Sequence, residues 1–455
     1  MSTRSGLPVA EGYGSPSAGE QITEQSICST RNHVKYSTAM NRWFLRPIGI
    51  WPVLPDAGTA EKVITEIQIV SCYFLICFLL VPCALHTFFD ESDPALRLKM
   101  LGPLSFCLMA IIQYCFLVQR RDKISVCLNH IANDWSYFRS PGDREIMLKD
   151  AKFGRFVASL CAAFMYGGSF FYHTIMPLSC DVIVTEQNVS LRPLSYPVYV
   201  TFFDAQLSPT YEIVFATQWF SGFVIHTVTI GACSIAAVFS MHACGQFKVL
   251  INRLNNLVDG DGTGDGNAND RMADIVEIHL RVLGFVGRVE GVLNEVCLVE
   301  FVGCTLNICF LGYYFMTEWE RSAAISTVTY CVLLVSFIFN ILIFCYIGEL
   351  LTEQSKRIGT VTYMIDWYRL RGHKARDLIL VLVMSRYPAS ITAGKMADLS
   401  LSNFCGVGIT FYLNYNLFFS INVSEIHRYS FNYLYLFKVL KTALTYLNLL
   451  RTVTG

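Results

Sequence analysis

The residues best suited to hold a metal ion lie in one acidic, glycine-rich run, Asp259-Gly-Asp-Gly-Thr-Gly-Asp-Gly-Asn-Ala-Asn-Asp270. Its acidic spacing begins like that of a calcium-binding loop, with Gly264 at the sixth position. Thr263, however, replaces a ligand, and Asp270 stands where a bidentate glutamate belongs. We therefore interpret the run as a flexible glycine-rich insert in a loop.

The 17 cysteines are the next candidates for metal or redox chemistry. They contain no CxxC pair and no histidine cluster lies beside them, which argues against a zinc site. Most of them sit inside apolar runs, as buried free thiols do. A bridge between Cys83 and Cys180, which both lie near the expected outer surface, stays open.

Catalytic motifs are missing from the sequence. It has no GxSxG, no HExxH, no phosphate-binding loop and no paired carboxylates in an apolar setting. We therefore predict a protein without enzymatic activity and without a cofactor. The balance of 35 Lys and Arg against 35 Asp and Glu also argues against a nucleic-acid partner.

Aromatic, histidine and methionine side chains are the remaining candidates for binding, and they crowd the expected outer ends of the apolar segments. A small apolar ligand suits such a lining, because small-molecule sites are mostly apolar with a few polar groups. The same residues could instead pack the helices or anchor them at the membrane surface. The candidates for ligand contact are Tyr166, Phe170, His173, Met176, Tyr211, Phe215, Trp219, Tyr313 and Tyr330, of which Tyr166 and His173 could orient a polar group.

The elements that must position these residues are membrane helices. The chain is 53% hydrophobic and 15% charged, whereas a soluble protein carries about a quarter charged residues. Spanning a bilayer takes about 20 mostly apolar residues. We predict an all-α polytopic membrane protein with seven transmembrane helices, the last of them split between Leu378–Met384 and Val439–Val453. The other six are Ile69–Phe89, Met100–Val118, Phe156–Leu178, Ile213–Met241, Val296–Phe315 and Ile325–Ile347.

The orientation follows from the Lys and Arg residues, which cytoplasmic loops hold preferentially. The N-terminal arm holds six, the second-to-third loop eight, the fourth-to-fifth loop five, and the stretch from Glu349 to Arg376 six. The other loops hold one or two each. This predicts a cytoplasmic N-terminus and an extracellular C-terminus. Asn188, in an Asn-Val-Ser sequon, then lies outside, as a glycosylation acceptor must. The polar first forty residues lack the apolar core of a signal peptide, so we expect insertion to begin at the first membrane helix.

Several stretches resemble one family. Asn41-Arg-Trp-Phe-Leu-Arg-Pro-Ile-Gly-Ile-Trp-Pro52 resembles the arm before the first helix of insect odorant receptors. Ser208-Pro-Thr-Tyr-Glu212 with Gln218 resembles the start of their fourth helix. The region between their sixth and seventh helices is resembled by Tyr346-Ile-Gly-Glu-Leu-Leu351, Ser355 and Asp366-Trp-Tyr-Arg369. Tyr387–Gly406 and Val439–Arg451, joined directly, resemble the family's closing signature.

The resemblance implies a tuning odorant receptor subunit in the plasma membrane of olfactory sensory neurons. Such subunits bind a volatile ligand and form an odorant-gated, non-selective cation channel with a co-receptor subunit, as a heterotetramer in contact with membrane lipid. The end of the last helix would line the pore, with Leu449 and Val453 as a constriction that excludes water. Tyr446 would share their face of the helix and Thr452 would lie close to the ion path.

An atypical insertion, 407–438, separates the two halves of the closing signature. It is rich in Phe, Tyr and Asn, and we interpret it as a retained intron, although an extra helix or an extracellular loop stays open.

The resulting divisions are an N-terminal arm (1–68), six helices with the ligand pocket (69–347), an anchor region with the first part of the last helix (348–406), the insertion, and a pore-lining end (439–455). Rival interpretations are a gustatory receptor of the same superfamily or a membrane transporter. A transporter should show internal repeats or midplane charges, but the spans are almost free of ionisable groups.

Overall fold

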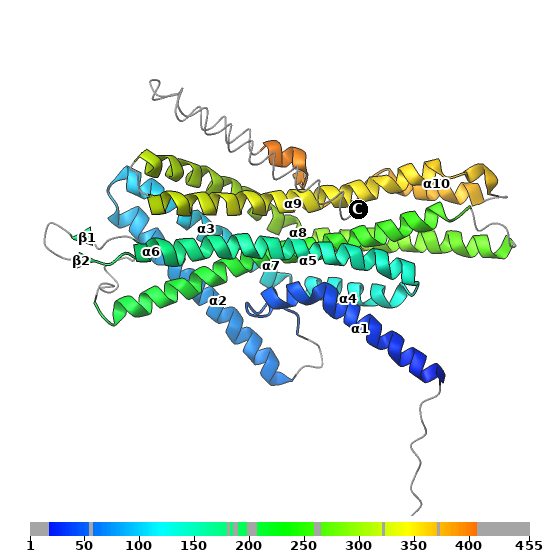
Figure 1. The fold of residues 1–455 in the computed structure, drawn as a ribbon, viewed down its shortest axis with the longest axis horizontal. Helices are drawn as coiled ribbons and strands as arrows, with labels where there is room; N and C mark the ends of the chain where they lie inside the picture. Colours follow the sequence, from blue (N-terminus) through cyan, green and yellow to red (C-terminus); the bar gives the residue numbers. More distant parts are fainter. Residues whose placement is uncertain are drawn as a thin grey trace, which may run out of the picture. The chain divides into compact units, whose positions relative to one another are not determined.

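The computed structural model describes residues 18–53, 58–179, 183–184, 190–197, 207–258, 265–320, 324–370 and 374–406. Long helices dominate this part of the chain (Figure 1). They are α1 (Ala18–Leu45), α2 (Thr59–Leu85), α3 (Pro94–Gln119), α4 (Arg121–Tyr137), α5 (Pro141–Phe170), α7 (Thr210–Asn255), α8 (Asp265–Glu320), α9 (Ala324–Met364) and α10 (Lys374–Ser385).

Short elements join or extend these helices. Two π-helical turns, η1 (His86–Asp90) and η2 (Phe171–Ile175), extend α2 and α5, and η2 leads into α6 (Met176–Ser179). The 3₁₀ turn η3 (Trp367–Arg369) follows α9. Two antiparallel pairs complete the set: β1 (Ile183–Val184) with β2 (Ser190–Leu191), and β3 (Thr392–Ala393) with β4 (Ala397–Asp398).

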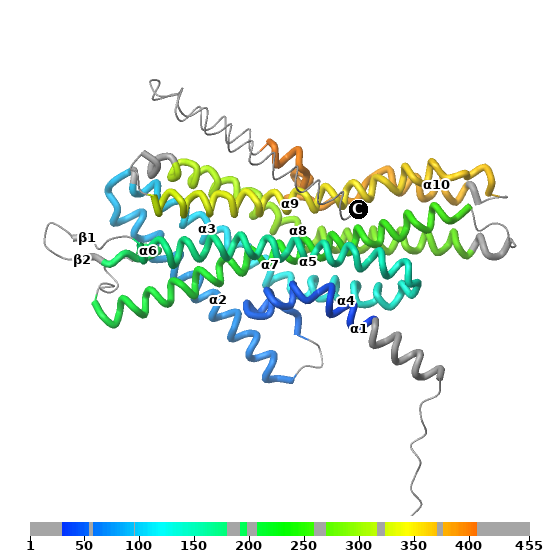
Figure 2. Tube along the Cα trace, viewed as in Figure 1, coloured from blue at the N-terminus to red at the C-terminus, as the bar shows by residue number. Residues whose placement is uncertain are grey.

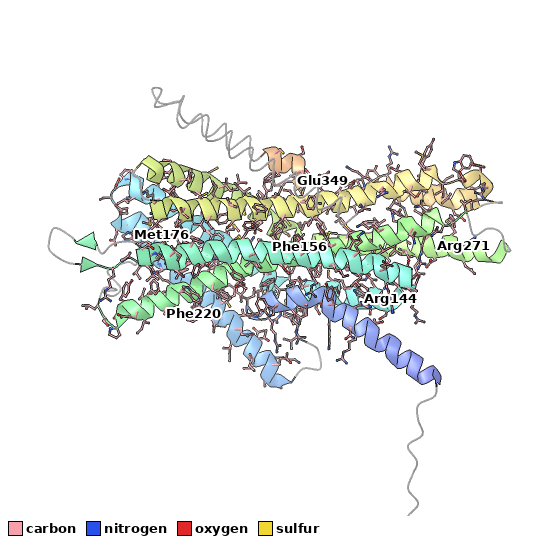
Figure 3. All side chains as sticks on the ribbon, in the orientation of Figure 1. Arg144, Phe156, Met176, Phe220, Arg271 and Glu349 are labelled. Carbon is pink, nitrogen blue, oxygen red and sulfur yellow. The ribbon has the colours of Figure 1, made fainter. Side chains whose placement is uncertain are left out.

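Helices α5, α7, α8 and α9 run side by side, with β1 and β2 at one end of the bundle and α10 at the other (Figure 1). Figure 3 shows the labelled Met176 near the β1–β2 end, and Arg144 and Arg271 toward the α10 end. Helix α7 is the centre of the packing, because every residue from Ile225 to Phe247 is buried.

Small residues allow the close approach of helices that this burial requires. A Cβ at Gly154 of α5 would lie 3.2 Å from Cβ of Met241 and 3.3 Å from the backbone oxygen of Ala237, both in α7. A Cβ at Gly245 of α7 would lie 2.9 Å from Sδ of Met147. Glycine at these positions therefore sets the distance between α5 and α7.

Five helices of the described residues are long and apolar enough to cross a membrane: Thr59–Asp90, Leu96–Gln119, Thr210–Asn255, Asp270–Phe315 and Ala324–Met364. Each contains one predicted span, and most continue well beyond it. The predicted third span, Phe156–Leu178, is helical through α5, η2 and α6 but is not among the five. Its second half carries Gly167, Gly168 and the polar side chains of η2, which dilute its apolar run.

Two predicted segments are partly helical in the structure, and the predicted divisions of the chain stay predictions. The glycine-rich run was expected to be flexible, but its last residues, from Asp265 onward, are the first turns of α8. The predicted arm (1–68) contains α1 and the first turns of α2, and α9 passes through the predicted boundary at residue 348. Among the described residues all cysteines are free, including Cys83, and no group of three or more His, Cys, Asp or Glu side chains could hold a metal.

The segment after α10 docks onto α8 through a tight turn. Gly394 (φ +60°) and Lys395 (φ +61°) adopt the left-handed backbone that joins β3 to β4. The Gly394 amide donates to the backbone oxygen of Asn294 over 2.7 Å. The Thr392 amide donates to Oε2 of Glu290 over 2.9 Å, and its hydroxyl donates to the other carboxylate oxygen. This turn fixes the chain that follows α10 against α8.

Replacing Gly348 of α9 with valine should destabilise this region. A Cβ there would lie 2.5 Å from both the Cβ and the backbone oxygen of Leu399, so backbone must move. Overpacking of this kind costs about 1–3 kcal/mol, which thermal unfolding of the purified chain in detergent would detect. Gly287→Ala is the control, because a Cβ at Gly287 meets nothing within 4 Å. Equal melting temperatures for the two variants would contradict the packing argument.

Candidate ligand site

A buried histidine marks the candidate site, at the β1–β2 end of the bundle. His173 lies in the π-helical turn η2 and is 2% exposed. Neither of its ring nitrogens has a hydrogen-bond partner among the residues that the structure describes. A π-helical turn inside a longer helix shifts the side chains that follow and often marks a functional site. A neutral imidazole offers one donor and one acceptor, and leaving them unpaired in the interior costs free energy.

Aromatic rings enclose His173. Tyr196 stacks on it with ring centroids 5.7 Å apart and an interplanar angle of 25°. His226 of α7 meets it edge-on at 5.9 Å. Gly222, one turn before His226, leaves room for the imidazole of His173, because a Cβ at Gly222 would lie 2.3 Å from Nε2 of His173. The absence of a side chain at this position is therefore a condition for the site.

Phenylalanines continue the site toward the middle of the bundle. The Phe106 ring of α3 lies 4.9 Å from His226 and 5.1 Å from Phe337 of α9, edge-on in both cases. Nδ1 of His226 lies 2.8 Å from the backbone oxygen of Gly222. Helices α3, α7 and α9 and the turn η2 thus meet at one apolar cluster with a few polar groups, which is the composition of small-molecule sites.

Polar contacts hold the edges of this cluster. The Tyr166 hydroxyl lies 2.9 Å from the Thr227 hydroxyl, and its ring stacks on Phe223 at 5.1 Å. Gln218, which is buried, accepts a hydrogen bond from the Tyr196 amide over 3.2 Å and donates to its backbone oxygen over 2.9 Å. Gln218 therefore fixes the segment that carries Tyr196.

The structure brings only some of the predicted residues to His173. Tyr166 lies beside Thr227 and Phe223, next to the cluster. Two others, Tyr313 and Tyr330, flank Tyr314 at 5.9 and 5.6 Å. The remaining candidates lie farther out: Met176 is half-buried on α6, Tyr211 and Phe215 stack on each other at 6.1 Å, and Phe170 and Trp219 are 52% and 40% exposed.

Sequence reasoning missed the inner part of the site, namely Gly222, His226, Tyr196 and Phe337. The sequence did contain a signal for Gly222 and His226, namely a histidine in an apolar span four residues after a glycine. Such a histidine indicates a polar site, because an imidazole buried in a membrane needs a specific environment. Tyr196 and Phe337 gave no such signal, since neither their type nor their spacing separates them from ordinary packing residues.

A buried carboxyl group, also missed, lies in α8 within the predicted fifth span. Glu300 is 1% exposed and accepts hydrogen bonds from the amide nitrogens of Gln113 in α3 and Asn340 in α9. Sγ of Cys304 donates to it over 3.0 Å. Ionisable groups inside a membrane are rare and usually functional. Glu300 thus joins α8 to α3 and α9, and these last two helices also frame the ligand site.

Glu300→Leu should be less stable than Glu300→Gln. Glutamine can still accept from Asn340 and Cys304, whereas leucine leaves the buried amides of Gln113 and Asn340 without their partner. Each buried polar group without a partner costs about 1–3 kcal/mol, so we expect a difference of about 2 kcal/mol between the variants. Thermal unfolding of the two purified chains measures it. If leucine is tolerated as well as glutamine, the hydrogen bonds of Glu300 do not hold the helices together.

A second buried carboxylate lies toward the α10 end, between α4, α7 and α8. Asp134 is fully buried, and its Oδ2 lies 2.8 Å from Nε2 of His242. Gln246 and Arg281 also donate to it, and His130 lies 3.4 Å away. Burial alone would raise the pKa of Asp134, but the hydrogen bond from His242 and the nearby positive charge outweigh it, so the pKa lies below its ordinary value. The imidazole of His242 therefore has a hydrogen-bond partner in the carboxylate of Asp134.

Part of the predicted site lies outside the described residues. This applies to the pore residues Tyr446, Leu449, Thr452 and Val453, to Asn188 of the glycosylation sequon, and to the insertion 407–438. Their roles stay predictions.

Together, the apolar helices and the aromatic site define the class of the protein, an all-helical, multi-pass membrane protein. A family model described as 7tm Odorant receptor matches residues 93–412, more than half of the chain. The chain belongs to the insect odorant receptor family, a family of receptors without enzymatic activity. This assignment decides against the gustatory receptor and the transporter.

Individual receptors are similar to the chain at low identity. Odorant receptor 10 of Aedes albopictus is 24% identical over 215 residues, which cover 47% of this chain and 56% of that receptor. Odorant receptor Or2 of Anopheles gambiae is 23% identical over 301 residues, covering 65% and 76%. The chain thus matches between about half and three quarters of the length of these two relatives.

The fold is also that of a solved receptor. The insect olfactory receptor OR5 from Machilis hrabei, determined in complex with eugenol, has a TM-score of 0.70 to this chain. The match covers 87% of this chain and 99% of that one at 15% identity. The tube in Figure 2 shows the course of the described part of the chain.

Proposed function

We propose that the chain is a tuning odorant receptor subunit that forms a ligand-gated, non-selective cation channel with a co-receptor subunit. Family membership supports the channel class. The observation that carries the ligand part of the proposal is His173, buried among aromatic rings with both ring nitrogens unpaired.

The ligand that fits this site is a small volatile molecule, mostly apolar, with one hydrogen-bonding group. The rings of Phe106, Tyr196 and Phe337 suit its apolar part, and His173 its polar group. A hydroxyl or carbonyl oxygen would satisfy one imidazole nitrogen and so recover free energy that the unliganded site lacks. A receptor of the same fold was determined with eugenol bound, which is consistent with a site for one small molecule.

The proposed orientation places the β1–β2 end outside the cell and the α10 end in the cytoplasm. The distribution of Lys and Arg supports it. In this orientation the subunit lies in the plasma membrane of olfactory sensory neurons, Asn188 is available for glycosylation, and Tyr446, Leu449, Thr452 and Val453 line the outer end of a shared pore.

We further propose that the insertion 407–438 is a retained intron. The Val407 codon begins with GT and a lysine codon at Lys438 can end in AG, as intron borders do. The family match also stops at residue 412, within the insertion. Sequencing of antennal cDNA across the junction tests this proposal, and transcripts that all retain the segment would overturn it.

Recording from oocytes tests the main proposal. The chain without 407–438 should give inward cation currents to members of an odorant panel when it is expressed with the co-receptor, and none when it is expressed alone. Odorant-evoked current without the co-receptor would contradict the heteromer. Surface-expressed subunits that respond to no volatile in the presence of the co-receptor would contradict the tuning role.

A further inference from the structure

The part of α1 from residue 25 onward carries positive charge on one face, and the acidic residues of α1, Glu20 and Glu24, come before it. From residue 25 to residue 55 the chain contains no Asp or Glu, but it contains Arg31, Lys35, Arg42 and Arg46. Helical geometry turns by about 100° per residue, which places these four residues within an arc of roughly 60°. The stretch thus has a basic stripe rather than scattered charges.

Burial confirms that the stripe faces away from the protein. All four residues are exposed, and Tyr36 and Trp43, which flank the stripe, are 37% and 73% exposed. The opposite face of α1 is buried through Ser37, Thr38, Asn41, Phe44 and Leu45. Arg46 continues the helical pattern just past the end of α1, since its amide donates to the backbone oxygen of Arg42 over 3.1 Å.

The cationic groups of the stripe have no partner within the described part of the chain. No ion pair or side-chain hydrogen bond joins Arg31, Lys35, Arg42 or Arg46 to any described residue. Exposed cations beside an exposed tryptophan, on a helix with a buried opposite face, are typical of a helix that lies in a membrane interface. Tryptophan prefers that depth because its ring is amphipathic.

The position of the stripe relative to α2 supports this depth. The turn after α1 packs on α2 at Gly49, where a Cβ would lie 2.8 Å from Cγ1 of Ile69 and 3.1 Å from the backbone oxygen of Thr65. At the same level Glu66 pairs with Arg121 over 3.2 Å. Beyond it, α2 carries no further charged residue, and the large side chains that it exposes are apolar, among them Ile67, Val70 and Phe74. The turn after α1 therefore lies near the last charged residue of α2.

A second contact places α1 at the same boundary. The guanidinium of Arg155 in α5 lies 3.9 Å from the centroid of the Tyr36 ring and donates to the backbone oxygen of Tyr36 over 2.9 Å. Phe156, the next residue of α5, is 47% exposed and opens the apolar part of that helix. Both α2 and α5 thus change from charged to apolar in this region.

We propose that this basic stripe, Arg31, Lys35, Arg42 and Arg46 with Tyr36 and Trp43, binds the headgroups of anionic phospholipids. The charge is complementary to phosphate and carboxylate, and arginine binds such groups with two parallel hydrogen bonds. Trp43 lies at the level of the glycerol backbone and acyl chains. The assignment does not depend on odorant binding or on the co-receptor; only the naming of the leaflet, the cytoplasmic one, rests on the orientation proposed above.

Lipid titration of the purified full chain in non-ionic detergent tests the proposal. Native mass spectrometry gives the Kd of the first bound phosphatidylserine and, separately, of the first bound phosphatidylcholine. A basic residue near an anionic surface contributes about fivefold in affinity, so the wild type should prefer phosphatidylserine by more than about tenfold. Arg42→Gln/Arg46→Gln should remove most of that preference.

Two further variants make the result specific. Lys356→Gln/Arg357→Gln removes the same number of exposed charges from α9 and should keep the preference. Arg42→Lys/Arg46→Lys keeps the charge and should retain most of it, which shows that the site tolerates substitution without loss of the fold. A wild type that binds both lipids equally overturns the proposal. So does a glutamine pair that keeps the preference, or an α9 control that loses as much.

Discussion

Asp134→Ala should lower the free energy of unfolding by about 3–5 kcal/mol, the cost of breaking a buried ion pair from one side. Asp134 is fully buried, and His242, with a 4% exposed side chain, and Arg281, at 23%, would lose their acidic partner. Gln246 would lose its acceptor as well. The uncompensated charge of Arg281, rather than the lost contact itself, accounts for most of the cost.

Thermal unfolding with a thiol-reactive dye measures this effect, because Cys127 and Cys244 are buried and free and become reactive only when the fold opens. Asp122→Ala is the matched control, since Asp122 is an exposed aspartate near the start of the same helix. Its loss should cost less than about 1 kcal/mol, the scale of a charge at a helix terminus. If the two variants unfold at the same temperature, the buried contacts of Asp134 do not stabilise the fold.

The same cluster predicts a dependence on pH. Burial lowers the pKa of His130 from 6.5 to about 4. The negative charge of Asp134 opposes this shift, whereas the nearby Arg288, Arg281 and His242 add to it. Between these values the unfolded chain binds a proton at His130 that the folded chain does not, so stability should fall as the pH drops through this window. Asp134, whose folded pKa is depressed, contributes stability that is lost as the pH falls through that folded pKa.

The variant His130→Gln isolates the histidine contribution. Its unfolding temperature should change less between pH 7 and pH 4 than that of the wild type, because glutamine does not titrate. A wild type that is equally stable across this range would refute the assignment of a proton uptake on unfolding to His130.

Gly222→Ala should abolish the odorant response or raise the half-maximal concentration by at least about tenfold, which is 1.4 kcal/mol of binding free energy. An alanine Cβ would lie 2.3 Å from Nε2 of His173, so the imidazole must leave its place between Tyr196 and His226. The ligand would lose both the polar partner and the shape of the site. Concentration–response curves from oocytes that express the variant with the co-receptor measure this change.

Gly167→Ala provides the control for this substitution. Gly167 lies in α5 near the same end of the bundle, and a Cβ there meets nothing within 4 Å. It should respond like the wild type, and both variants should reach the cell surface in similar amounts. A Gly222→Ala receptor with wild-type sensitivity would place the ligand elsewhere.

Sequence reasoning located the membrane helices but not their full lengths. The spans follow from apolar composition, which the bilayer demands and which single residues report directly. Helix α7 continues to Asn255, and α8 begins at Asp265, because outside the bilayer a helix can carry charge and needs only neighbours to pack against. Composition gives no sign of that packing, and the glycine-rich run before α8 was for this reason assigned wholly to a loop.

The sequence predicted the type of the candidate site, an aromatic site with a few polar groups, but not most of the residues that form it. Tyr166 and His173 stood out as polar groups among aromatic residues near one end of a span. Gly222 and His226 are neighbours on α7 that act on His173 through space, and no sequence spacing links positions 173 and 222. Glu300 was an isolated acid in an apolar run until Gln113 and Asn340 were seen beside it.

The burial of α7 from Ile225 to Phe247 has a consequence for how the receptor is made. The polar side chains of its buried stretch, among them Thr229, Ser234 and His242, face neighbours in the finished protein. Helices α8 and α9, which cover much of α7, are synthesised after it. Their translation takes roughly 5–20 s at about 5–20 residues per second. During that interval α7 can already pack against α1 and α5, which precede it in the chain. Two of its buried polar groups also have partners made before it, Asn41 for Ser234 and Asp134 for His242. The helices made first can thus cover part of α7 until α8 and α9 complete its burial.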